Sequence, residues 1–162
     1  MLFISPFERR TEEMSEKTKD FFISYTQVDR AWAEWITWQL EAAGYSTILQ
    51  AWDFRPGSNF VLEMDKATKI AHRTLVLLSP DYINALYTQP EWAEAFRQDP
   101  KGEQGTLLPV RIRPCPLEGL LAAIGYIDLV NLPEADTKEK LLKGLRRERA
   151  IPKTPPPFPG HS

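Results

Sequence analysis

The chain has 162 residues, which suits one domain with a single hydrophobic core. Its 20 Lys and Arg nearly balance 22 Asp and Glu, so the net charge is −2 and we expect no general attraction to nucleic acid or to an anionic membrane. The single cysteine, Cys115, excludes a disulfide within the chain, and two histidines are too few for an ordinary zinc site. No apolar run approaches the roughly 20 residues of a membrane span, so we expect a cytoplasmic protein without a metal.

The first half of the chain alternates between strand and helix patterns after a charged leader over residues 1–18. The apolar run DFFISY predicts a strand over 20–25 that is buried on both faces. Apolar residues then recur at helical spacing from 28 to 43, and Gly44 is expected to end that helix. The β-branched segment 45–50 predicts a second strand.

A loop over 51–59 follows, and either Ser58 or Asn59 is expected to cap a second helix over 60–71. The most apolar run, 73–79, predicts the central strand, with Ser79 and Pro80 as N-cap and first residue of the next helix.

The second half of the chain predicts two more strands, over 107–112 and 126–130, and a last helix over roughly 137–149. Five prolines within 151–162 predict a polyproline-type linker or tail, so the domain is expected to span 19–150. Such a segment often joins a module to further domains of a longer polypeptide.

Strands that alternate with helices predict an α/β fold, with a parallel sheet covered by helices on both faces. We expect a flavodoxin-like, five-stranded sheet in the order 2-1-3-4-5. Ligands of such sheets bind at the carboxyl ends of the strands, here between strands one and three. Ser24 and Tyr25 leave strand one, and Ser79 leaves strand three. Glu91 follows within about a dozen residues, so topology alone places this acid near the predicted crevice.

The sequence lacks the motifs of several other kinds of functional site. Strand one is not followed by paired acids of the kind that accept a phosphoryl group, since no acid comes before Asp29. Neither GxGxxG nor GxxxxGK occurs, which excludes the usual phosphate-binding loops. No histidine stands near a plausible nucleophile, so a His-based triad is not expected.

Three segments together resemble a known family. DFFISYTQVDRAW, AWDFRPGSNF and TLVLLSPDYINALYTQPEW are similar to the conserved boxes and intervening loop of Toll/interleukin receptor (TIR) domains, especially bacterial ones. The resemblance covers about residues 19–147. It implies one of two activities: scaffolding by self-association, or hydrolysis of NAD⁺ at the nicotinamide–ribose bond.

The resemblance implies that Glu91 is the catalytic residue. In the NAD⁺-cleaving members the essential glutamate lies in the pattern W-C-x-x-E-L, and this chain has YTQPEW over 87–92. Tyr replaces Trp, Thr replaces Cys and a proline precedes the acid, but the spacing from aromatic to glutamate is kept. Such a carboxylate can stabilise the oxocarbenium-like ribose by hydrogen bonds to its hydroxyls. NAD⁺ would be the substrate, and no cofactor is implied.

The resemblance also assigns two further sets of residues. Aromatic and polar side chains at the rim are expected to bind the substrate: Ser24, Tyr25, Trp52, Phe54 and Tyr87. The loop after strand two is expected to contact other TIR domains through Asp53, Arg55, Pro56 and Gly57. The leading prediction is an NAD⁺ glycohydrolase, yielding ADP-ribose or its cyclic form, that is activated by self-association in bacterial antiphage defence.

Each prediction has an alternative. Glu91 fits a capping box in which Thr88 is the N-cap, Tyr25 and Ser24 fit packing and turn roles, and residues 53–56 fit a simple turn. Three tryptophans at helical spacing, Trp32, Trp35 and Trp92, are expected in the core. The alternative function is a non-catalytic module for TIR–TIR interaction, and a weaker one is a receptor that binds ADP-ribose derivatives without cutting them.

Overall fold

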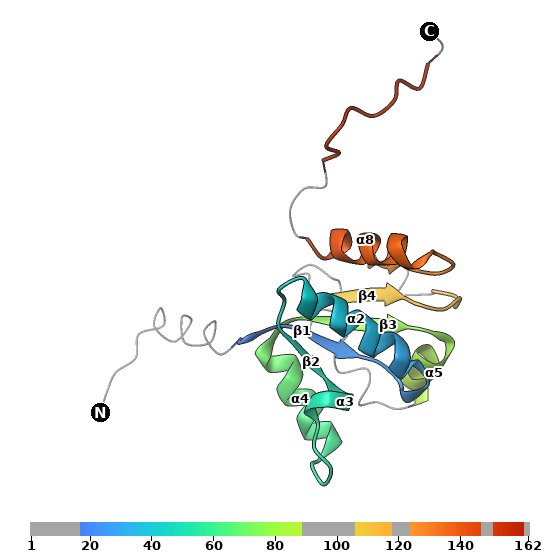
Figure 1. Ribbon diagram of the computed structural model, residues 1–162. Coiled ribbons are helices and arrows are strands. Elements are labelled where there is room, and N and C mark those ends of the chain that lie inside the picture. The colour runs from blue at the N-terminus through green and yellow to red at the C-terminus, as the bar shows by residue number, and fades with distance from the viewer. Residues whose placement is uncertain (1–16, 89–105, 118–123, 147–150, 161–162) are drawn as a thin grey trace, which may run out of the picture.

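The described strands of the protein lie in one parallel sheet. The computed structural model describes residues 17–88, 106–117, 124–146 and 151–160. Within these ranges the strands are β1 (Lys19–Ser24), β2 (Thr47–Leu49), β3 (Ala71–Leu78), β4 (Leu107–Arg111) and β5 (Ile127–Asp128). They pair in the order β2-β1-β3-β4-β5 (Figure 1). The predicted flavodoxin-like order, 2-1-3-4-5, is confirmed.

Helices cover both faces of this sheet. The described helices are η1 (Gln27–Asp29), α2 (Arg30–Ala42), α3 (Gln50–Asp53), α4 (Phe60–Ile70), α5 (Pro80–Thr88) and α8 (Glu134–Leu145). Buried residues of α2 and α8 share one hydrophobic cluster, and those of α4 and α5 share a second. Neighbouring residues of a strand point to opposite faces of the sheet. Ile23 belongs to the first cluster and Phe22 to the second, so the two clusters lie on opposite faces.

The ends of three helices are fixed by residues that the sequence singled out. Gly44 has φ +97°, and the Tyr45 amide donates to the Leu40 carbonyl at 3.0 Å, which is a Schellman motif. Asn59 Oδ1 accepts from the Leu62 amide at 3.1 Å, so Asn59 rather than Ser58 caps α4. Ser79 Oγ accepts from the Tyr82 amide at 3.2 Å and caps α5, as predicted.

Several predicted boundaries differ from the structure. The third strand spans Ala71–Leu78 instead of 73–79, and the fifth spans only Ile127–Asp128 instead of 126–130. The second strand is shorter than 45–50, since Gln50–Asp53 forms the short helix α3 within what was expected to be strand end and loop. The last helix begins at Glu134 and ends at Leu145 instead of spanning roughly 137–149. Its first turn holds two acids, Glu134 and Asp136, which favour a helix N-terminus by their charge and not by apolar spacing. A prediction based on the spacing of apolar residues therefore does not detect this first turn.

Two of the three tryptophans of α2, Trp32 and Trp35, lie at the margin of the core. Both residues, which were expected in the core, pack against the first cluster and are half-buried. Trp92 lies outside the described residues. In the described ranges, no helix has the length and apolar character needed to cross a membrane.

Candidate functional site

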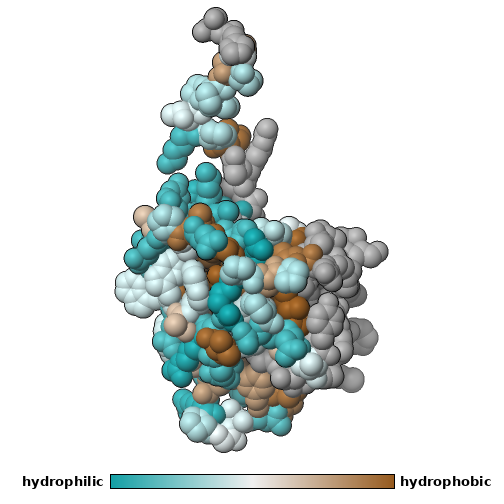
Figure 2. All heavy atoms as spheres, turned by 90° about the vertical axis from the view of Figure 1, so that its right-hand side faces the viewer, coloured by the Kyte–Doolittle hydropathy of each residue, from teal (hydrophilic) through white to brown (hydrophobic). Residues whose placement is uncertain are grey.

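The carboxyl edge of the sheet contains the predicted switch point between β1 and β3. The chain leaves β1 through η1 and α2 toward one face, and it leaves β3 through α5 toward the other. Figure 2 looks onto this edge, where hydrophilic and hydrophobic side chains share the surface. The polar groups described below belong to segments that meet here.

A buried carboxylate connects three of these segments. Asp29, in η1, is only 2% exposed. Its Oδ1 accepts from Arg113 Nε at 2.7 Å, and its Oδ2 accepts from Ser79 Oγ at 2.5 Å and from Thr26 Oγ1 at 3.2 Å. Arg113 also donates to Asp81 in the first turn of α5. One carboxylate thus holds together the chain after β1, the cap of α5 and the chain after β4.

The charges of this cluster explain how it tolerates burial. A buried carboxylate is costly unless it is paired and hydrogen-bonded, and Asp29 has both a guanidinium and two hydroxyl donors. The hydrogen bonds to Asp29 and Asp81 raise the pKa of Arg113 above its usual value, so the pairing is kept throughout the physiological range. Because each carboxylate oxygen of Asp29 already has a donor, the cluster suits a rigid frame better than a nucleophile.

A second buried contact joins β1 to α5. Ser24 Oγ and Tyr82 Oη lie 2.8 Å apart, and both residues are almost fully buried. Burial raises the pKa of the Tyr82 hydroxyl well above its usual value, so this group stays protonated. The Ser24 hydroxyl therefore has an internal partner, and its contact with a substrate stays a prediction.

Tyr25 packs inward instead of facing the rim. It is 1% exposed and belongs to the first hydrophobic cluster. Its hydroxyl accepts from the Ala51 amide at 3.1 Å, in the first turn of α3, and burial raises its pKa. This geometry suits the packing role that was the alternative for Tyr25, and stacking on a substrate ring stays a prediction.

The two aromatics after β2 lie in different surroundings. Trp52 is 50% exposed, so its ring is accessible to a ligand at this rim. Phe54 stacks on Phe22, with ring centroids 6.3 Å apart and an interplanar angle of 19°, and meets Phe60 edge-on at 6.1 Å. Trp52 is therefore the better placed of the two for binding a planar ligand.

The predicted interaction loop is exposed. Asp53, Arg55, Pro56 and Gly57 all have exposed side chains or backbone, and the loop projects from the body between α3 and α4 (Figure 1). Its start is fastened because Asp53 Oδ2 accepts from the Leu49 amide at 2.7 Å. The Ser58 amide donates to the Arg55 carbonyl at 3.2 Å, and Gly57 has φ +88°, which closes a turn.

The predicted catalytic segment is described only in part. Glu91 lies outside the described residues, and Tyr87 lies in α5 with its side chain undescribed. Thr88 is helical, and its hydroxyl donates to the Asn84 carbonyl at 2.9 Å. An N-cap is non-helical and its side chain accepts a hydrogen bond. The capping-box alternative for Glu91 therefore loses its N-cap residue.

Sequence reasoning missed Asp29, Asp81 and Arg113 as a group. The available signals were an acid five residues after β1 and an arginine two residues after β4, both at the edge where a site was expected. In the described ranges, no cluster of three His, Cys, Asp or Glu side chains is arranged to hold a metal.

The sequence matches one family model. The model described as "TIR domain" matches residues 21–143, which is most of the chain. No sequence among curated proteins matches.

Solved structures share the fold. The TIR domain of the Toll-related receptor TRR-2 from Hydra magnipapillata is 26% identical, with a TM-score of 0.62 over 79% of this chain and 95% of that one. A TIR-STING receptor from C. gigas, solved with 2',3'-cGAMP, is 19% identical with a TM-score of 0.68 over 80% of this chain. The match spans only 40% of that receptor. The TIR domains of the activated Roq1 resistosome, which recognises the pathogen effector XopQ, are 17% identical with a TM-score of 0.63 over 80% of this chain and 100% of that one.

Proposed function

Because this chain belongs to the TIR domain family, we propose that it cleaves NAD⁺ at the nicotinamide–ribose bond, with Glu91 as the catalytic carboxylate. The bond between nicotinamide and the ribose carbon would break, and water would bond to that carbon and release a proton to give ADP-ribose. In the cyclic alternative, a group of the same molecule would take the place of water. The nicotinamide ring of NAD⁺ is a cationic pyridinium and becomes neutral when it leaves the ribose. The leaving group therefore needs no proton from a general acid.

The observation that carries the proposal is the polar network at the carboxyl edge. Ser79, the cap of α5, donates to the buried Asp29, so the start of α5 is fixed at the switch point between β1 and β3. In the sequence, Glu91 comes three residues after Thr88, the last residue of that helix. A rigid frame at the switch point supports a site whose catalysis depends on preorganised electrostatics.

One carboxylate is sufficient for a large rate effect in this reaction. The transition state develops positive charge on the ribose, and hydrogen bonds from its hydroxyls to an ionised acid strengthen as that charge grows. Loss of one such preorganised contact costs roughly a hundredfold to a thousandfold in rate. The half-exposed Trp52 would bind a ring of the dinucleotide by stacking.

We also propose that copies of the domain associate through the exposed loop over residues 53–57. Its polar and turn-forming residues are accessible, and its start is held by the Asp53 bond to the Leu49 amide. Association would activate the enzyme in bacterial antiphage defence in the cytoplasm, with further domains beyond the proline-rich segment bringing copies together.

Incubation of the protein with NAD⁺ tests the activity. We expect nicotinamide to be released at high protein concentration, or at low concentration when the chain is fused to an oligomerising domain. An oligomeric, folded protein that releases no nicotinamide at any concentration would contradict the enzymatic proposal.

A non-catalytic TIR–TIR interaction module is the second candidate, and the projecting loop favours it. The observation is that Arg55, Pro56 and Gly57 are all exposed on a turn closed by the Ser58 amide. In this case Arg55→Ala and Pro56→Ala weaken association measured by analytical ultracentrifugation, and the associated wild type leaves NAD⁺ intact.

A further inference from the structure

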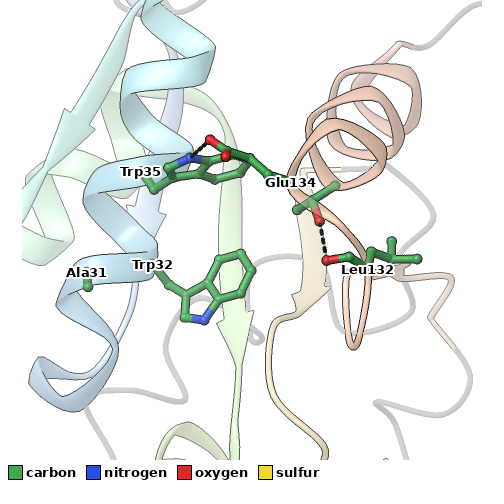
Figure 3. Close-up of a pocket in the computed structure, with 6 residues that line it drawn as sticks. Ala31, Trp32, Trp35, Leu132 and Glu134 are labelled. Carbon is green, nitrogen blue, oxygen red and sulfur yellow. Dashed lines mark hydrogen bonds between the residues drawn. The ribbon is translucent and has the colours of Figure 1, made fainter.

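A hollow lined by tryptophan lies between α2 and the start of α8, and none of the lining residues named below takes part in the polar network described above. Its volume is about 360 Å³, and the described residues that line it are Ala31, Trp32, Trp35, Leu132, Glu134 and Thr137. Figure 3 shows Trp32 and Trp35 pointing from α2 toward the loop before α8 and the helix's first turn. Pockets of this size are large enough for a small ligand or for a few residues of a peptide.

The two indoles form the apolar wall of this hollow. Their ring centroids are 6.0 Å apart and the planes meet at 81°, so the two rings present a face and an edge to the same space. Trp35 Nε1 lies 3.4 Å from Glu134 Oε1, which is long for a hydrogen bond. Trp32 Nε1 has no acceptor among the residues drawn in Figure 3. Aromatic rings beside weakly engaged N–H donors are suited to proline rings and to the exposed carbonyls of a polyproline II helix.

The chain itself carries a segment of that chemistry. Residues 151–160 read IPKTPPPFPG, and all of them are exposed. A polyproline II helix has three residues per turn, so Pro152, Pro155 and Phe158 would line one of its faces. Phe158 has a large apolar side chain that is 78% exposed in the structure.

Charge and reach both favour this segment as the occupant. Lys153 would lie on the face next to the apolar one, and the exposed Glu134 stands at the rim of the hollow. The seven residues from Leu145 to Pro152 span at most roughly 24 Å. The distance back along α8 from Leu145 to Glu134 is about 16 Å. The segment can therefore reach the hollow of its own chain, where a short tether gives a high effective concentration.

We propose that the proline-rich segment 152–158 binds in the Trp32–Trp35 hollow of the same chain as a polyproline II helix. The face formed by Pro152, Pro155 and Phe158 contacts the indoles, and Lys153 pairs with Glu134. The site is thus an intramolecular receptor for a proline-rich, basic peptide.

The indole N–H resonances of the 162-residue protein test this by NMR. The double variant Pro155→Ala/Phe158→Ala changes the docking face of an exposed segment and leaves the core intact. We expect it to shift the Trp32 and Trp35 indole resonances. Trp38, on the same helix but 63% exposed and not part of the hollow, is the internal control and should not move.

The matched control variant is Pro157→Ala, since Pro157 lies on another face of the same polyproline II helix. It should leave the Trp32 and Trp35 resonances at their wild-type positions. A synthetic peptide of residues 151–160, added to the double variant, should restore them. Coincident indole spectra of the wild type and the double variant would overturn the proposal, and shifts that depend on protein concentration would overturn the same-chain arrangement.

Discussion

Arg113, two residues beyond β4, donates from Nε to Oδ1 of the buried Asp29 at 2.7 Å. The bond closes a gap of 84 positions in the sequence and joins the chain after β4 to the chain after β1. Since β3 lies between these two strands, the bond spans the carboxyl edge at which we place the site.

Arg113→Met is expected to destabilise the fold by about 3 kcal/mol, because it leaves the Asp29 carboxylate buried without its cation. The free energy of unfolding from urea titration measures this. Arg30→Met is the matched control, since Arg30 pairs with Glu34 on the surface and such pairs contribute about 0–1 kcal/mol. An equal loss of unfolding free energy in the two variants would show that the Asp29–Arg113 pair stabilises the fold no more than a surface pair does.

Tyr82→Phe is expected to cost about 1–2 kcal/mol, because it removes the partner that lies 2.8 Å from the buried Ser24 hydroxyl. The double variant Ser24→Ala/Tyr82→Phe should lose less than the sum of the two single variants, since the unsatisfied group is gone. Thermal and urea unfolding of the three proteins give this coupling. If the loss of stability in the double variant equalled the sum of the two single losses, the proposed coupling between Ser24 and Tyr82 would be contradicted.

Gly44→Ala is expected to cost about 1 kcal/mol, because the residue has φ +97° and alanine is strained in that region. Gly125→Ala makes the same change at a position without positive φ, and a Cβ has open space at both positions. Steric contact is thus equal, and only the backbone conformation differs. A Gly125→Ala loss as large as that of Gly44→Ala would contradict this explanation.

The ion pair between Arg111 and Asp128 predicts a pH dependence. Arg111 donates to both carboxylate oxygens, at 3.1 and 2.7 Å, and this hydrogen bonding lowers the pKa of Asp128. A lowered folded-state pKa adds stability above the unfolded pKa of about 4, and that stability is lost as the pH falls through the folded value. Asp128→Asn should therefore be less stable at pH 7, by about 1 kcal/mol since the pair is partly exposed, and the difference should vanish in acid.

Urea titrations of Asp128→Asn between pH 7 and pH 2 measure this dependence. The control is Asp65→Asn, which removes a more exposed acid that pairs with Lys69 and is expected to have the smaller effect at every pH. A destabilisation of Asp128→Asn that persists unchanged at pH 2 would exclude the charge as its cause.

The sequence was sufficient for the sheet because its strands are buried on both faces. Such strands are continuous apolar runs, and RTLVLLS over 73–79 is recognisable without any partner. Helix ends with local chemistry, such as Gly44 and Asn59, were also predictable. The first turn of α8 was not, because its acids carry no apolar period.

The arrangement of the site was harder to predict than its location. The switch point between β1 and β3 follows from strand order, but the Asp29–Arg113 bond joins residues whose pairing has no local pattern. The burial of side chains was also hard to predict. Tyr25 and Phe54 were expected at the rim, but Tyr25 lies in the first cluster and Phe54 stacks on Phe22. Side-chain direction at the end of a strand depends on the packing of neighbouring elements, which a single sequence does not show.

The most direct test of the proposed activity is chromatography of NAD⁺ products with Glu91→Gln beside the wild type. The matched control is Glu139→Gln, an exposed acid on α8. We expect the wild type and Glu139→Gln to release nicotinamide at the same rate, and Glu91→Gln to be slower by roughly a hundredfold to a thousandfold with an unchanged circular dichroism spectrum. Turnover of NAD⁺ by Glu91→Gln at the wild-type rate would contradict the role that we assign to this carboxylate.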